Sequence, residues 1–245
     1  MWIDIDGDKI SYQVYGDGEN LICIHGWLEN KSFFRYSSYR RFLENYKVYS
    51  IDLPGFGNSS MIEDVSIEKV AKIINSFSEK LNLKKINILG QCMGTVFALD
   101  YIIRYPEKVK SIILIEPVLF FPWWFKIFLL PKVNKCILKG FLKYKLLTKI
   151  INRHKPIKGF FRDKKRIKNI KKARVENALR YVKLLYGVSK ENYYNRLKTI
   201  KVPVKVVTGE NTFKEVKEST KILKNVINEV EHVEYSKKNH FIFNN

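Results

Sequence analysis

Short apolar runs alternate with longer segments of helical periodicity along much of the chain. The runs at 21–24 and 86–89 carry no charged residue, as expected of strands that are buried on both faces of a sheet. Residues 66–81 instead place apolar side chains at helical spacing. Strands that alternate with helices predict an α/β fold with a mostly parallel central sheet.

The same patterns predict further elements on both sides of residue 116. Residues 1–15 alternate between polar and apolar around Gly7-Asp8, which indicates a β-hairpin. Further strands are expected at 47–51, 109–115, 202–207 and 232–235, and further helices at 32–45, 95–104 and 213–226.

The alternation of strands and helices stops at Pro117 and resumes only with the strand at 202–207. The stretch between them predicts helices alone, and it follows the carboxyl end of a strand, where an active site would lie. We therefore expect a core formed by residues 1–116 and 201–245, with residues 117–200 inserted as a helical lid.

Charge separates the same two regions. The chain of 245 residues has a net charge of +21. Residues 117–200 hold 23 Lys and Arg against three acidic residues, which gives +20 and leaves +1 for the rest. A basic lid on a nearly neutral body favours an anionic partner near the mouth of the site, although a general enrichment in lysine would explain part of the excess.

Composition bounds the setting of the protein. Hydrophobic residues make up 46% of the chain, enough for one α/β domain with an insertion. The first residues lack the basic start and apolar segment of a secretory signal. Three cysteines at no metal-binding spacing argue against a disulfide framework. We expect a cytoplasmic protein without a metal or an organic cofactor.

Residues 90–94, Gly-Gln-Cys-Met-Gly, follow the apolar run at 86–89 and precede a helix. Glycines two residues before and after Cys92 allow the strand and the helix to approach each other closely. The amides of the helix start then point at any oxyanion formed there. The simpler interpretation is a buried cysteine in an ordinary turn, and most proteins with this pattern carry serine at the centre.

Four landmarks together resemble the α/β-hydrolase superfamily across residues 1–116 and 201–245. They are His25-Gly26-Trp27, the segment Asp-Leu-Pro-Gly-Phe-Gly at 52–57, the Cys92 turn and a terminal Asn-His-Phe at 239–241. The resemblance implies the α/β-hydrolase fold, with the segment at 52–57 as a structural turn.

The resemblance also implies roles for individual residues. Cys92 matches the nucleophile and His240 the base, while the backbone N–H groups of Trp27 and Met93 match the oxyanion hole. The alternative for His240 is a solvated histidine near the end of the chain.

The acid departs from the usual pattern of the family. After the strand at 202–207 the family generally shows Gly-x-x-Asp, but here Thr212 takes the place of the aspartate. Haloalkane dehalogenases instead carry the acid after the strand before the lid, and that position resembles Glu116. A carboxylate there would orient the histidine, and a capping role for Glu116 is the alternative. Glu210 is the second candidate for the acid and Asn211 the third.

A cysteine nucleophile changes the chemistry. A helix start and a nearby imidazolium favour the thiolate, which then needs less help from the third residue. Dienelactone hydrolases, and some thioesterase-like domains that transfer acyl groups, use cysteine at this position. A thioester acyl-enzyme suits acyl transfer as well as hydrolysis. The sequence is also compatible with a cysteine that replaces a natural serine.

The most apolar stretch of the chain lies at 118–130 and includes Phe120, Trp123 and Trp124. As a helix its thirteen residues would rise only ~20 Å, too short to cross a bilayer of ~30 Å. We expect these three aromatic residues to line a pocket for the acyl chain. An interfacial surface that faces lipid and simple packing on the body are the alternatives.

These features predict a hydrolase or acyltransferase that acts on an acyl ester or thioester through a Cys92 acyl-enzyme. The basic lid fits an acidic acyl-carrier protein, coenzyme A or an anionic membrane surface, and no recognition motif supports nucleic acid. The alternative from another class is a relative without catalytic activity that binds lipid, membrane or acyl carrier, its acid having been lost at Thr212.

Overall fold

The computed structural model describes residues 1–35, 37–121, 123–131, 134–143, 175–187 and 190–243. Their centre is an eight-stranded sheet in the order β1-β2-β4-β3-β5-β6-β7-β8. The strands are β1 (Trp2–Ile5), β2 (Asp8–Tyr15), β3 (Glu19–Ile24), β4 (Tyr46–Ile51), β5 (Ile86–Gln91), β6 (Val109–Ile115), β7 (Val204–Gly209) and β8 (Val230–Tyr235).

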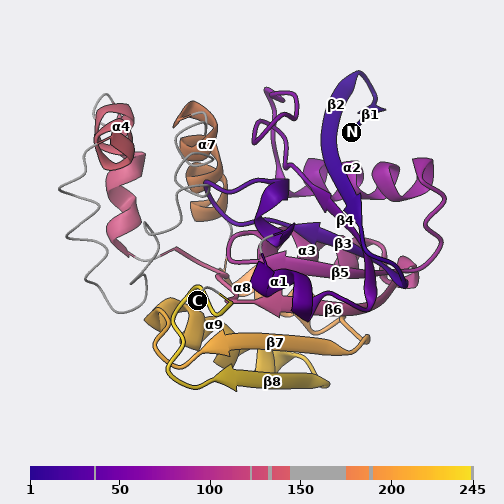
Figure 1. Cartoon of the computed structure of the whole chain (residues 1–245). Helices are drawn as coiled ribbons and strands as arrows, with labels where there is room; N and C mark the ends of the chain where they lie inside the picture. Colours follow the sequence, from indigo (N-terminus) through magenta and orange to yellow (C-terminus); the bar gives the residue numbers. More distant parts are fainter. Residues whose placement is uncertain (36, 122, 132–133, 144–174, 188–189, 244–245) are drawn as a thin grey trace.

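The sheet is antiparallel at one edge and parallel elsewhere. Strand β1 pairs antiparallel with β2, and β2 pairs antiparallel with β4. From β4 to β8 in the sheet order, every neighbouring pair is parallel. The parallel strands therefore share one carboxyl edge. In Figure 1 the arrowheads of β7 and β8 point towards the side of the molecule where α4 and α7 lie. This confirms the α/β-hydrolase fold expected from the sequence.

The helices follow the predicted order with one difference. They are η1 (Lys31–Arg35), α1 (Ser37–Phe42), α2 (Ile67–Lys80), α3 (Gly94–Arg104), η2 (Pro106–Lys108), η3 (Trp123–Leu129), α4 (Asn134–Lys143), α7 (Val175–Tyr186), α8 (Lys190–Leu197) and α9 (Lys214–Val226). The single helix expected at 32–45 is instead two short pieces, η1 and α1.

Two hydrophobic clusters cover the two faces of the sheet. Strand β3 shows the division, because Ile22 and Ile24 belong to the larger cluster with α2 and α3, whereas Leu21 and Cys23 belong to the smaller one with α1. Successive side chains of a strand point to opposite faces. Cys23 is fully buried, and burial raises the pKa of its thiol. It is a core residue, as the apolar run predicts.

The helices η3, α4 and α7 form a third cluster beside the carboxyl edge of the sheet (Figure 1). Phe125, Leu138 and Val182, one from each, are among its buried members. Residues 144–174, which include the densest run of lysine and arginine, lie outside the described residues. No helix that the structure describes is long and apolar enough to cross a membrane. The division of the chain at residues 117 and 200 stays a prediction.

Candidate active site

Cys92 lies on a sharp turn between β5 and α3. Its φ of +51° is in the left-handed region, which is uncommon for a residue with a side chain. A Cβ on Gly90 would lie 2.7 Å from the carbonyl oxygen of Gly94, and one on Gly94 would lie 2.3 Å from that of Ile24. Glycine is therefore required on both sides, and the turn presents Cys92, half-buried, at the start of α3.

His240 connects Cys92 to a carboxylate. Its Nδ1 lies 2.7 Å from Oε2 of Glu116, and Cys92 lies near enough to the ring to raise the pKa of the imidazole. Because Nδ1 is engaged by Glu116, Nε2 is the nitrogen left for the sulfur. The ends of β5 and β6 and the final loop thus bring Cys92, Glu116 and His240 together.

Glu116 is held from several directions. It follows β6 directly, has a φ of +52° and is fully buried. Its backbone N–H donates to the carbonyl of Val207 over 2.8 Å. Its Oε1 accepts a bond of 2.6 Å from the N–H of Gly209, and its Oε2 accepts from the hydroxyl of Thr212 as well as from His240. These bonds compensate for the removal of the carboxylate from water.

The environment of His240 favours its protonated form. Burial alone lowers the pKa of the imidazole, but the charge and hydrogen bond of Cys92 and those of Glu116 outweigh burial and raise the pKa to about 9. Phe213 and Phe241 pack edge-on against the ring, with centroids 5.0 Å and 5.1 Å away. The ring is thus fixed in orientation and shielded from water.

Neither of the other two candidates for the acid is among the described side-chain partners of His240. Glu210 is exposed, and its Oε2 accepts bonds from the N–H of Lys237 and the hydroxyl of Ser236. Lys237 holds the pKa of this carboxyl below its usual value. The backbone N–H of Asn211 donates to the carbonyl of Lys238. Among the described contacts of His240, Glu116 is the one carboxylate.

The two amides expected to bind an oxyanion flank the sulfur. A Cβ on Gly26 would lie 3.0 Å from that of Cys92, so the turn that carries Trp27 approaches Cys92 closely. Met93 is the next residue after Cys92 and caps α3. Within the described chain, neither the Trp27 N–H nor the Met93 N–H donates a hydrogen bond to another residue. Both are therefore available to an incoming oxygen.

His25 and Asp52 make hydrogen bonds that hold the loop of Gly26 and Trp27 and the segment at 52–57 in place. His25 is fully buried, its Nδ1 lies 2.8 Å from the carbonyl of Gly26, and its Nε2 accepts from the N–H of Leu53. Burial lowers the pKa of this imidazole, so it is neutral and carries its proton on Nδ1. Asp52 is bound by Lys31 and by the N–H of Asn58. The segment at 52–57 is a structural turn, as the resemblance implies.

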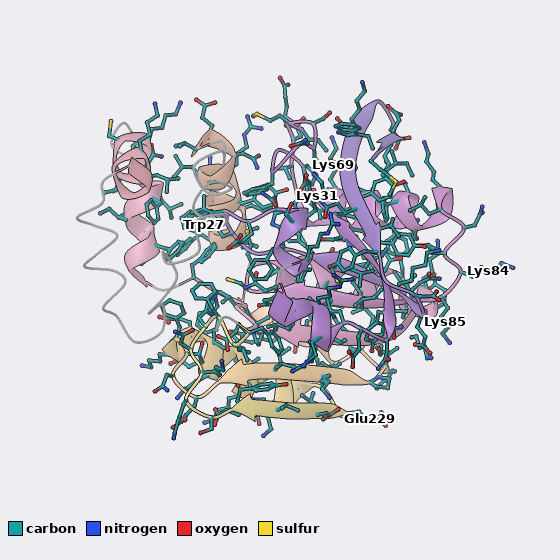
Figure 2. All side chains as sticks on the ribbon, viewed as in Figure 1. Trp27, Lys31, Lys69, Lys84, Lys85 and Glu229 are labelled. Carbon is teal, nitrogen blue, oxygen red and sulfur yellow. The ribbon has the colours of Figure 1, made fainter. Side chains whose placement is uncertain are left out.

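The side chain of Trp27 contacts both η3 and α7. Its ring packs against Phe125 with a centroid distance of 5.1 Å, and its Nε1 donates to the carbonyl of Ala178 in α7 over 3.0 Å. Phe121 stacks on Phe125 at 4.4 Å. Figure 2 shows Trp27 beside α7, at the opposite end of the sheet from Lys84 and Lys85.

The predicted pocket residues are only partly described. Phe120 is half-buried and packs against the larger cluster of the sheet. Trp123 and Trp124 begin η3, but the placement of their side chains lies outside what the structure describes. Their role as a pocket wall stays a prediction.

Sequence reasoning missed the part that Thr212 takes in the site. The sequence pattern marks Thr212 only as the position where an aspartate is missing, whereas its buried hydroxyl donates to Glu116. One signal could have indicated this role. Thr212 has a hydroxyl at the position from which the family's usual acid would reach His240. In the part of the chain that the structure describes, no cluster of His, Cys, Asp and Glu has the arrangement of a metal site.

A family model for the alpha/beta hydrolase fold matches residues 19–244. The chain belongs to this family. Pimeloyl-[acyl-carrier protein] methyl ester esterase of Wigglesworthia glossinidia brevipalpis is 28% identical over 219 residues, which cover 81% of this chain and 77% of that protein. The protein of the same name from Shewanella woodyi is 33% identical over 100 residues, 41% of this chain and 36% of that protein.

Solved structures agree with the fold. A carboxylesterase structure from the thaumarchaeon Nitrososphaera gargenis superposes with a TM-score of 0.76 at 18% identity, over 99% of this chain and 92% of that one. The family and its esterase members support a hydrolase activity for this chain.

Proposed function

We propose that the protein hydrolyses an acyl ester through a covalent thioester on Cys92. The observation that carries this proposal is the grouping of three residues: Cys92 on a strained turn, His240 beside it, and Glu116 bonded to Nδ1 of His240. A nucleophile, a base and a group that orients the base are what acyl transfer requires.

The geometry supports the following steps. His240 Nε2 takes the proton of the Cys92 thiol, and the sulfur attacks the carbonyl carbon of the ester. The N–H groups of Trp27 and Met93 bind the oxyanion. The carbon–oxygen bond to the alcohol breaks, and the alcohol leaves with the proton from His240. Water then attacks the thioester, His240 accepts its proton, and the acid departs as the thiol of Cys92 is restored.

Glu116 has two tasks in this scheme. By accepting from Nδ1 it keeps Nε2 free to take a proton, and its charge stabilises the imidazolium between the steps. Cys92 and, after it, Glu116 raise the pKa of His240, which supports this second task.

The proposed substrate is an ester whose acyl group is attached to an acyl-carrier protein. The names of two relatives support this class. The net charge of +20 on residues 117–200 also fits an acidic carrier. Acyl transfer to another acceptor would follow the same first step.

The alternative of a relative without activity depended on the loss of the acid at Thr212. Glu116 supplies a carboxylate to His240 from another strand, so this reason for the alternative no longer applies.

The test is mass spectrometry of the intact protein after incubation with p-nitrophenyl esters of increasing chain length. We expect release of nitrophenol together with an acyl adduct on Cys92. Cys92→Ala should abolish both while it leaves the circular dichroism spectrum unchanged. Cys23→Ala is not a suitable control because Cys23 is buried in the core, so Cys136→Ser, at an exposed position of α4, serves instead. Full turnover in Cys92→Ala would contradict the proposal.

A further inference from the structure

Thr212 contacts the same carboxylate oxygen as His240. Its hydroxyl donates to Oε2 of Glu116, and Nδ1 of His240 lies 2.7 Å from that oxygen. Thr212 itself is buried, with 7% of its surface exposed. A hydroxyl at this position is thus part of the immediate surroundings of the histidine's partner.

The two oxygens of Glu116 are held by different kinds of donor. Oε1 accepts from a backbone N–H, that of Gly209 at the end of β7. Oε2 has no backbone donor among the described contacts, so Thr212 is the side chain that restrains it apart from His240. Without this restraint, Oε2 would be held by His240 alone, and the carboxylate would be less firmly oriented about its last bond.

We propose that Thr212 is a positioning residue, which holds Oε2 of Glu116 in the plane where Nδ1 of His240 binds it. This inference rests on the proposed function. Thr212 acts through Glu116 and contacts no reacting atom. The hydrogen bond from a hydroxyl to a charged oxygen is among the stronger ones in proteins.

The position explains why threonine suits this chain. A carboxylate on residue 212 would lie against the carboxylate of Glu116, and two like charges in a buried site repel each other. A hydroxyl donates to Glu116 instead. Glu116 and Thr212 therefore form a matched pair, in which the acid comes from β6 and its support from the loop after β7.

The experiment compares three single variants. Thr212→Val removes the hydroxyl and keeps the volume, and Thr212→Ser keeps the hydroxyl. Thr220→Val is the matched control, because Thr220 is also buried and its hydroxyl donates to the carbonyl of Val216 within α9. Two rates are measured for each protein: kcat with a p-nitrophenyl ester, and alkylation of Cys92 by iodoacetamide, assigned by peptide mass spectrometry.

We expect Thr212→Val to lower both rates about tenfold to a hundredfold with little change in KM. Thr212→Ser should keep both within about threefold, and Thr220→Val should match the wild type. In a Glu116→Gln background Thr212→Val should cause no further loss, because the charge that it positions is already gone.

Three outcomes separate the inference from the proposed function. Wild-type rates in Thr212→Val would overturn the inference, and so would an equal loss with and without Glu116. Absence of ester turnover in the wild type would overturn the proposed function, and alkylation of Cys92 would still decide the role of Thr212.

Discussion

Two strands of the sheet end in a buried carboxylate, and the two carboxylates have different kinds of partner. Asp52 follows β4 and Glu116 follows β6, and both side chains are fully buried. Asp52 accepts from the N–H and the ammonium of Lys31 and from the N–H of Asn58. All three groups can only donate, so the direction of every one of these hydrogen bonds to Asp52 is fixed.

Glu116 has one partner of that kind, the N–H of Gly209. Its other partners, the hydroxyl of Thr212 and the imidazole of His240, can each donate or accept. The protons around Glu116 can therefore be rearranged while the heavy atoms stay in place. A carboxylate whose partners can either donate or accept suits a site of proton transfer. A carboxylate whose partners can only donate suits a structural turn.

The largest effect is expected from Glu116→Gln. The amide can donate to Thr212 and to Nδ1 of His240, which forces the imidazole proton onto Nε2. That nitrogen then cannot accept the proton of Cys92. We expect kcat/KM for p-nitrophenyl esters to fall about a thousandfold, or about 4 kcal/mol.

The fold should tolerate this change, because both side-chain partners can reverse their hydrogen bonds. The free energy of unfolding in urea should fall by less than about 1.5 kcal/mol. A loss of stability as large as that of an Asp52 variant, with activity retained per folded molecule, would mean that Glu116 is structural.

Asp52→Asn should show the opposite pattern. The NH2 of the asparagine would face at least one of the three groups that can only donate. The ammonium of Lys31, whose side chain is 12% exposed, would lose its counter-charge. Breaking a buried ion pair from one side costs about 3–4 kcal/mol. We expect urea unfolding to detect this loss, while kcat at 15 °C, where the protein is still folded, stays within about tenfold of the wild type.

Lys31→Met tests the same pair from the other side. It should also destabilise, since Asp52 would keep two backbone donors but lose the charge that balances it. Unchanged stability in both variants would remove the distinction between the two turns.

The sequence was sufficient for the body of the fold, because its signals are local. Strand β6 was predicted with its observed limits, 109–115, and Ser66 caps α2 through the N–H of Lys69. The glycines around Cys92 and the order of the landmarks identified the turn. Apolar runs and turn residues act over a few positions, and the sheet brings their ends together without further information.

The surroundings of Glu116 depend on contacts between distant residues. Glu116 and Thr212 are 96 positions apart, and nothing in either segment specifies their hydrogen bond. The contact of Trp27 with Ala178 spans 151 positions. Sequence analysis ranked Glu116 ahead of Glu210 by resemblance alone, and only the geometry shows which carboxylate lies against His240. Residues 144–174, the most basic part of the expected lid, lie outside the described residues, so the lid stays a prediction.

The smallest expected effect is a pH dependence of the free energy of unfolding, which His240 beside Glu116 should cause and Asp52 should not. Cys92 and Glu116 raise the pKa of His240 from 6.5 to about 9, against the effect of burial. Between these values the folded protein binds a proton that the unfolded chain has released. Protonated His240 therefore adds stability that is complete below pH 6.5 and is lost as the pH rises through about 9.

Urea unfolding of the wild type and of His240→Gln between pH 6 and pH 9.5 measures this contribution. The stability advantage of the wild type should shrink across that interval by up to about 3 kcal/mol. Cys92→Ala removes the first of the groups that raise the pKa, so the decline should be smaller in that background. Asp52→Asn should leave the decline with pH unchanged, because none of the described partners of Asp52 contacts His240. An advantage that stays constant with pH would show that His240, like Asp52, has a fixed pattern of protons.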